Sequence, residues 1–406
     1  MKVSVIGNGG REHALRHGLA KTSTMVEEPT EADLVVIGPE TPLVDGLADD
    51  LRAKGLLVYG PGASGARLEG SKQYMKDFVA RAGVPTARYK SVTSIEEAED
   101  FFDSLTTGFV IKTDGLAAGK GVLVTTDRSE ASQDVKEKLS GSSFGDAGRK
   151  VVIEELMTGP EVSVMFVFDG KRGMVLPPAQ DFKRALDHDK GPNTGGMGAY
   201  SPVPFMSDTL MQAINDNVLV PTAEQLQREK IDYRGTLYAG LMITADGPRL
   251  VEYNVRFGDP ETQVIVPLLD GDFAGLLSSA ASGSIDESQV QVTTRCAVTV
   301  TLASAGYPES SRKGDVISGI NSANELPGVT VYEAGVARDD NGVVTTNGGR
   351  VLNVTAVGDS LNGARAAAYE AVNLISFDGM HYRSDIALAA ANKTALPGNA
   401  PQGDSE

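Results

Sequence analysis

The stretch KVSVIGNGGREH, residues 2–13, decides the fold of the N-terminal part of the chain. Its apolar run at 2–6 predicts a short buried strand, the glycines after it predict a tight turn, and the residues from Arg11 to about Lys21 predict a helix. Similar strand-like runs follow at 34–40 (LVVIGPE) and 56–61 (LLVYGP). Strands that alternate with helices predict a parallel, doubly wound sheet.

The rest of the chain divides into a central and a C-terminal region. The stretch SKQYMKDFVARAG predicts a helix, and strand-like runs follow at 109–115, 121–126, 151–156, 161–170, 237–244 and 249–255. The composition turns small and polar around 283–292, and short strands and one strong helix come after it. We therefore expect an N-terminal α/β domain over 1–75, a central domain over 76–282, a small α+β domain over 283–391 and a disordered tail over 392–406.

Composition excludes several classes of protein. The formal net charge of -17 over 406 residues repels a nucleic-acid backbone, and no apolar run is long enough to span a bilayer. The N-terminus lacks the pattern of a signal peptide, so we expect a cytoplasmic protein. The single cysteine allows no disulfide framework, and the four histidines include no metalloprotease motif.

The glycine turn at 7–10 is the first candidate binding site. Backbone amides at the start of a helix attract an anion, so the residues from Gly7 to His13 are candidates for that role. The turn is not a dinucleotide fingerprint, because Glu12 stands where the third glycine would be. On its own, the pattern is equally typical of a tight corner between a strand and a helix.

The lysine loop IKTDGLAAGKG, residues 111–121, is the second candidate site. Small residues and the two lysines, Lys112 and Lys120, suit an amide-rich cover over phosphates. The spacing differs from that of a Walker A loop, which has Ser or Thr after the lysine where this chain has Gly121. The alternative interpretation is a solvated hairpin loop.

Two further stretches carry groups of polar residues. Glu252, Asn254 and Arg256 alternate along a predicted strand and so share one face, which indicates two oxygen ligands for a magnesium ion beside a guanidinium group. The alternative is a solvent-exposed polar face. QDFKR (180–184) and GPNTGGMGAYSP (191–202) show no obvious secondary structure, and their polar side chains could hold a small zwitterion.

Ten segments of the chain together carry a resemblance that runs from residue 1 to about 390. They are GNGGREHAL, VVIGPETPL, LEGSK, IKTDGLAAGKGV, VVIEEL, QDFKR, GPNTGGMGAYSP, LYAGLMI, EYNVRFGDPETQ and GGRVLNV. In this order they resemble the phosphoribosylamine-glycine ligases, also called glycinamide ribonucleotide synthetases, of the ATP-grasp superfamily. The resemblance implies an α/β and α+β multidomain fold, with a shortened doubly wound N-terminal domain, an ATP-grasp central domain and a small α+β C-terminal domain.

The resemblance also implies a reaction, its cofactors and its site residues. The reaction is the ATP-dependent ligation of glycine to 5-phosphoribosylamine through a glycyl phosphate, in de novo purine biosynthesis, by a monomer with Mg²⁺ or Mn²⁺ and ATP as co-substrate. The implied catalytic residues are Asp181, Lys183 and Arg256, and the implied metal ligands are Glu252 and Asn254. The implied ATP-binding residues are Lys72, Lys112, Gly115, Gly119, Lys120, Glu154, Leu156 and Glu161. The implied substrate-binding residues are Gly9, Gly10, Arg11, Glu40, Asn193 and Thr194.

One segment departs from the family pattern. Only about twenty residues separate REHAL from VVIGPE, which leaves no room for the further strand–helix unit that the family has there. We expect an open position in the first sheet and a weakened ribosylamine site. The alternatives are another ATP-grasp carboxylate-amine ligase or a non-catalytic ATP-binding relative.

Overall fold

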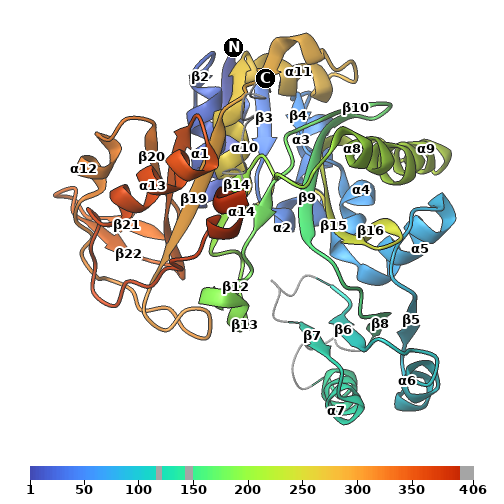
Figure 1. The fold of residues 1–406 in the computed structure, drawn as a ribbon. Coiled ribbons are helices and arrows are strands. Elements are labelled where there is room, and N and C mark those ends of the chain that lie inside the picture. Colours follow the sequence, from blue (N-terminus) through green and yellow to red (C-terminus); the bar gives the residue numbers. More distant parts are fainter. Residues whose placement is uncertain (116–120, 142–149, 394–406) are drawn as a thin grey trace, which may run out of the picture.

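The computed structural model describes residues 1–115, 121–141 and 150–393 (Figure 1). Four parallel strands form the N-terminal sheet in the order β2-β1-β3-β4, and the sequence predicts three of them, β1, β3 and β4, and their parallel arrangement. Its strands are β1 (Lys2–Ile6), β2 (Thr24–Met25), β3 (Leu34–Ile37) and β4 (Val58–Tyr59). Its helices are α1 (Gly10–Leu19), η1 (Pro29–Glu31), α2 (Glu40–Val44), α3 (Leu47–Ala53) and α4 (Ala63–Gly70).

The expected open position in this sheet is wrong. After α1 the chain returns directly to the edge of β1, where the short strand β2 pairs in parallel with it. The amide of Thr24 donates to the carbonyl of Met1 at 3.0 Å, and that of Val26 donates to the carbonyl of Val3 at 3.0 Å. Two residues of strand thus cover the edge, although a full strand–helix unit does not fit in this length of chain.

A small lobe follows the N-terminal part, and Figure 1 shows it extending from the body of the molecule. Its antiparallel sheet has the order β5-β8-β6-β7, and α6 and α7 pack on it around a core of their own. Ser71 caps the helix that leads into it, because the Ser71 hydroxyl accepts from the amide of Tyr74 at 3.1 Å. The elements are α5 (Lys72–Ala82), β5 (Tyr89–Val92), α6 (Ile95–Phe102), β6 (Phe109–Thr113), β7 (Val122–Thr125), α7 (Arg128–Leu139) and β8 (Val151–Glu155).

A second antiparallel sheet has the order β10-β9-β15-β16. The predicted pairing of 237–244 with 249–255 is confirmed, and its register sets Tyr238 opposite Asn254 and Gly240 opposite Glu252. The strands are β9 (Glu161–Asp169), β10 (Gly173–Val175), β15 (Arg234–Thr244) and β16 (Gly247–Asn254). The helices of this part are α8 (Asp208–Ile214), η4 (Asn215–Leu219), α9 (Val220–Arg228), α10 (Thr262–Ile265), η5 (Val266–Leu268) and α11 (Phe273–Ala281).

The third sheet joins the central region to the C-terminal region, in the order β11-β14-β19-β23-β20. Its strands are β11 (Gln180–Asp181), β14 (Gly198–Ser201), β19 (Cys296–Ala303), β20 (Val329–Glu333) and β23 (Arg350–Gly358). The expectation that 180–202 lacks regular structure is therefore wrong: β11 and β14 enter this sheet, and the residues between them form the hairpin of β12 (Arg184–Leu186) and β13 (Lys190–Asn193).

The remaining elements complete the C-terminal region and the connections. They are η3 (Asp187–Asp189), β17 (Leu269–Gly271), η6 (Glu287–Gln289), β18 (Val290–Val292), α12 (Ile320–Asn324), β21 (Val336–Arg338), β22 (Val344–Thr346), α13 (Leu361–Val372) and α14 (Leu388–Lys393). Helix α13 packs on β19 and β23. Of the tail expected to be disordered, 392–406, residues 392 and 393 belong to α14, and residues 394–406 lie outside the described residues. Within the described ranges, no helix is long and apolar enough to cross a bilayer.

One apolar core connects the three regions. Val35 of β3, Val164 of β9 and Val298 of β19 are fully buried in the same cluster of side chains. Because such cores are close-packed, the three regions are held in fixed relation to one another.

Candidate active site

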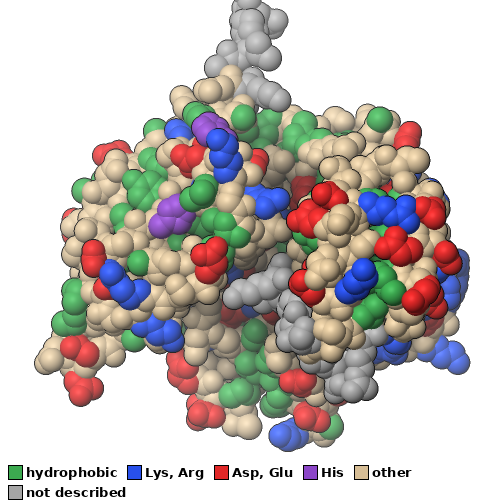
Figure 2. Space-filling model, turned by 90° about the horizontal axis from the view of Figure 1, so that it is seen from below, with side chains coloured by type: hydrophobic (Ala, Val, Ile, Leu, Met, Phe, Trp, Pro, Cys, Tyr) green, Lys and Arg blue, Asp and Glu red, His purple; other side chains and the backbone are tan. Residues whose placement is uncertain are grey.

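A cavity of about 790 Å³ lies where the small lobe, the central sheets and the C-terminal sheet meet. Figure 2 shows this face of the molecule, hollowed near its centre, with basic and acidic side chains visible there. The cavity lining includes most of the residues expected from the sequence: Arg11, Glu40, Lys72, Lys112, Gly115, Glu154, Leu156, Glu161, Asp181, Lys183, Asn193, Thr194, Glu252, Asn254 and Arg256. Residues from 11 to 256 in the sequence thus share one site.

Four expected residues do not belong to this described lining. Gly119 and Lys120 lie outside the described residues. The Gly9 amide donates to Glu12 Oε2 at 2.7 Å, so this amide is already used inside the turn. A Cβ atom on Gly10 would lie 2.4 Å from Asn353 Oδ1, which shows that Gly10 provides a close approach between α1 and β23.

The carboxyl end of β16 presents polar groups to the cavity. Glu252 and Asn254 point to the same face because strand side chains alternate, while Tyr253 between them is buried in the core. Lys72 Nζ lies 3.0 Å from Glu252 Oε2. This lysine keeps the pKa of Glu252 far below its ordinary value, so Glu252 is ionised at neutral pH.

Two further lysines, Lys76 and Lys112, hold the carboxylate of Glu154 at the end of β8. Lys76 Nζ lies 2.6 Å from Glu154 Oε2, and Lys112 Nζ lies 2.8 Å from Glu154 Oε1. Burial opposes ionisation of Glu154, but the two ammonium groups lower its pKa below the ordinary value. Burial lowers the pKa of Lys76 to about 8, although Glu154 opposes this shift. The fixed carboxylate in turn holds Lys112 at the cavity wall.

Asp181 and Lys183 come from the strand and turn that begin the third sheet. Lys183 Nζ lies 2.5 Å from Glu161 Oε2. Burial raises the pKa of Asp181 to about 7, and the carboxylates of Glu261 and Glu161 add to this rise while Lys183 opposes it. The cavity therefore contains a carboxyl group that can change its charge near neutral pH.

Arg256 lies just beyond β16 and links the N-terminal region to the cavity. Its guanidinium group lies 3.0 Å from Glu69 Oε1, 3.3 Å from Glu40 Oε2 and 3.2 Å from Asn254 Oδ1. Arg11 Nη1 reaches Glu40 Oε2 at 3.8 Å and donates to the carbonyl of Phe257 at 3.2 Å. Because Arg256 and Arg11 both contact Glu40, they lower its pKa despite its burial.

Sequence reasoning missed several residues of the lining. Glu69, Tyr238, Asp259, Glu261 and Arg350 all line the cavity. Glu261 Oε1 accepts from the hydroxyl of Tyr238 at 2.7 Å, which buries a polar group at the wall. The signal was present, since four of them lie in the segments LEGSK, RFGDPETQ and GGRVLNV and Tyr238 lies in LYAGLMI.

Arg350 joins three parts of the chain at the edge of the cavity. Its Nη1 donates to the carbonyl of Gly195 at 2.7 Å and to that of Asp259 at 2.8 Å, and its Nη2 lies 3.1 Å from Asp259 Oδ2. The guanidinium group therefore fixes the turn after β13 and the turn after β16 to the start of β23. No single segment of the sequence reveals this contact.

Comparisons with known proteins place the chain in a family. Residues 24–69, 70–262 and 297–389 match the N domain, the ATP-grasp (A) domain and the C domain of phosphoribosylglycinamide synthetase. The phosphoribosylamine-glycine ligase of Neisseria meningitidis serogroup A is 42% identical over 425 aligned positions, which cover 97% of this chain and 100% of that protein. The ligase of the same name from Vibrio parahaemolyticus is 41% identical, over 96% of this chain and 98% of that protein.

A crystal structure shows the same architecture. The phosphoribosylamine-glycine ligase of Thermotoga maritima superposes with a TM-score of 0.83 at 34% identity, over 95% of this chain and 100% of that chain. The Neisseria alignment has more positions than this chain has residues, so the relative carries segments that are absent here. Similarity of this extent, over all three regions, shows that the chain belongs to the phosphoribosylglycinamide synthetase family.

Proposed function

We propose that this chain ligates glycine to 5-phosphoribosylamine with ATP, forming glycinamide ribonucleotide, ADP and phosphate, a step of de novo purine biosynthesis. Its similarity to phosphoribosylamine-glycine ligases over nearly the whole chain supports this activity. The structural observation that carries it is the cavity to which all three regions contribute. Two bond-forming steps with three substrates require such a common site, because intermediates must not escape to water.

The reaction consists of two transfers. A carboxylate oxygen of glycine attacks the γ-phosphorus of ATP, and the bond to ADP breaks to leave glycyl phosphate. The amine nitrogen of phosphoribosylamine then attacks the glycyl carbonyl carbon, the bond to phosphate breaks, and the amine loses one proton. The protein contributes mainly by positioning the groups and neutralising their charge.

ATP lies against the small lobe. Lys72 and Lys112 face the phosphates, Leu156 and Glu154 lie beside the adenine, and Glu161 holds the ribose. All five residues line the cavity, which supports this assignment. The carboxylate partners of the lysines keep the ammonium groups in place before ATP arrives, so the binding energy is not spent on ordering them.

Glu252 and Asn254 hold Mg²⁺ or Mn²⁺. The donor set fits such an ion, because Glu252 is ionised, Asn254 offers an amide oxygen, and magnesium takes one or two protein oxygens together with substrate phosphates. Within the described ranges no cluster of three or more His, Cys, Asp or Glu residues could hold a metal on its own, which agrees with a site completed by ATP. The ion, when bound, neutralises charge on the transferring phosphoryl group.

Glycine and the amine lie at the other wall. Arg256 and Lys183 offset the negative charge of the carboxylate and of the acyl phosphate, and Asn193 and Thr194 orient the glycine. Asp181 takes the proton that the attacking amine releases, since a carboxyl group whose pKa lies near the working pH suits proton transfer. Arg11 and Glu40 contact phosphoribosylamine, and Gly9 and Gly10 set the course of the turn beneath it.

The test measures ADP release by the purified chain. We expect release only when ATP, glycine, freshly generated phosphoribosylamine and Mg²⁺ are all present, with glycinamide ribonucleotide identified by mass spectrometry. Omission of each substrate in turn provides the control. Release with another amine in place of phosphoribosylamine identifies a different ATP-grasp ligase, and ATP binding without any release identifies a non-catalytic relative. Light scattering tests the proposal that the chain acts as a monomer.

A further inference from the structure

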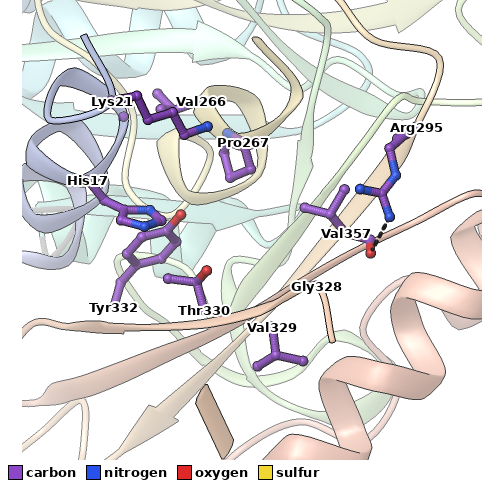
Figure 3. Close-up of a pocket in the computed structure, with 11 residues that line it drawn as sticks. His17, Lys21, Val266, Pro267, Arg295, Gly328, Val329, Thr330, Tyr332 and Val357 are labelled. Carbon is purple, nitrogen blue, oxygen red and sulfur yellow. Dashed lines mark hydrogen bonds between the residues drawn. The ribbon is translucent and has the colours of Figure 1, made fainter. Parts of the chain in front are cut away.

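A second, smaller cavity lies at the C-terminal end of α1. This end is remote from the cavity of the candidate active site, which we call the active cavity. Its volume is about 210 Å³, and it is lined from α1, η5, the entrance to β19, β20 and the end of β23. Figure 3 shows His17 and Lys21 on one side, Arg295 on the opposite side, and Thr330 and Tyr332 projecting from β20. The linings of this cavity and of the active cavity have no residue in common.

The charge of this cavity is opposite to that of the protein. The chain carries 54 acidic against 37 basic residues, yet Lys21 and Arg295 line the cavity and none of its described lining residues is Asp or Glu. Lys21 makes no ion pair with any residue in the described part of the chain. Arg295 is held at the wall, because its Nη2 donates to the carbonyl of Val357 at 3.1 Å. Its ion pair at 3.4 Å is with Asp359, whose side chain is 98% exposed and does not line the cavity.

Uncharged groups complete a polar wall. The Tyr332 ring is buried and meets the His17 ring edge to face, with the ring centres 5.8 Å apart. The ring of His13 contacts the same tyrosine, also at 5.8 Å. These contacts restrict the orientation of the His17 imidazole. Thr330 adds a hydroxyl group beside it (Figure 3).

Stabilisation of the helix end does not account for this arrangement. Basic side chains at the C-terminal end of a helix interact favourably with its dipole, which would explain His17 in the last turn of α1 and Lys21 just beyond it. Arg295 and Thr330 come from other elements, however, and converge on the same space from the far side. Donors from three parts of the chain around a cavity whose described lining has no carboxylate are the arrangement that binds an anion.

We propose that this cavity binds a small phosphate-bearing anion, held by Lys21, Arg295, His17 and Thr330. The cavity is large enough for a phosphate group with its bound waters, since one water takes about 30 Å³ in the liquid. The anion contacts the helix whose other end carries Arg11 at the active cavity, about 15 Å away along α1. The site therefore provides a physical connection to the catalytic cavity without belonging to it.

Nuclear magnetic resonance of His17 tests the proposal, with inorganic phosphate as the probe. The chain has four histidines, so each labelled imidazole gives a separate signal, and His17→Gln assigns the relevant one. The pKa of His17 lies below its ordinary value because of burial and because His13 on the same helix and Lys21 just beyond it oppose its charge. Arg295 lies across the cavity, and Tyr332 lies against the ring. We expect phosphate, against chloride at equal ionic strength, to shift the His17 signal saturably and to raise its pKa.

Matched variants identify the site. Lys21→Ala and Arg295→Ala should each weaken phosphate binding, as read at His17, by about fivefold, because each removes one exposed charge contact. Lys54→Ala removes an equally exposed lysine elsewhere and should leave the affinity unchanged. Absence of a saturable shift, or equal affinity in all three variants with unchanged thermal unfolding, overturns the proposal.

Discussion

Replacement of Arg350 by methionine separates positioning from chemistry at the active cavity. Methionine retains much of the apolar stem but loses the guanidinium group that joins the carbonyl groups of Gly195 and Asp259. The side chain of Arg350 is 20% exposed, so water can reach part of the space that it leaves. Methionine at position 350 cannot donate a hydrogen bond, so it provides no link between either turn and the start of β23. We expect both turns to move within the folded protein.

The size of the effect follows from the lost contacts. A hydrogen bond to a charged group contributes about 1.5 to 3 kcal/mol, so two of them amount to about 3 kcal/mol when partial replacement by water is allowed for. If all of this free energy serves to position the turns, the rate falls by about two powers of ten. A misplacement of about 1 Å in an active site has an effect of the same order. We therefore expect kcat to fall by about thirtyfold to a hundredfold.

Steady-state kinetics with each substrate varied in turn measures this effect, alongside thermal unfolding. Arg365→Met is the matched control, because Arg365 also donates to two backbone carbonyl groups, those of Ile386 and Ser384, at 2.9 and 2.6 Å. Arg365 does not line the cavity, so its loss should destabilise the C-terminal region and leave kcat unchanged. Equal kcat losses in both variants, or full activity in Arg350→Met, would refute the positioning role.

Four other variants test the site and its surroundings. Glu252→Gln and Asn254→Ala should each lower turnover at least a hundredfold with unchanged thermal unfolding, since only the metal and its phosphates need these oxygens. Turnover near the parent level in either variant would contradict the role in metal binding. Because the pKa of Asp181 is raised in the fold from 3.8 to about 7, its ionisation opposes folding, so the parent loses stability as pH rises through that range. Asp181→Asn should flatten this pH dependence in thermal unfolding and lower kcat, and an unchanged slope would contradict the assigned charge. Gly10→Ala should lower the free energy of unfolding by about 1 to 3 kcal/mol, because the added methyl group would be overpacked against Asn353. We expect faster hydrogen exchange in α1, and unchanged exchange would show that Asn353 moves aside.

Much of the fold could be predicted because its signals are local. Strand β1 has the bounds that its apolar run indicates, and α5 begins at the Ser71 cap and ends at Gly83, which has a φ of 74°. The hairpin of β15 and β16 follows from its turn and from the alternation of its side chains. Each of these features depends on residues that are neighbours in the sequence.

The features that were missed depend on contacts between distant residues. Strands β11 and β14 are only two and four residues long, and they enter a sheet because β19 pairs with β14 from almost one hundred residues later in the chain. Strand β2 similarly depends on the free edge of β1. The alternation of side chains along β16 predicts that Glu252 and Asn254 share one face, and both line the cavity. Arg350, in contrast, reaches the cavity from β23 in the third sheet. The alternation of polar and apolar residues within one segment carries no information on such pairings.

The pairing of β14 with β19 has a consequence for dividing the protein. The two strands are paired over four positions, from Gly198 opposite Val300 to Ser201 opposite Ala297. Cleavage of the chain near residue 285 would leave β19 as an unpaired edge in one fragment and β14 as an unpaired edge in the other. Such edges favour association with any available strand. Two fragments produced together should therefore recombine by strand addition, as the halves of a split reporter do, whereas either one alone should aggregate.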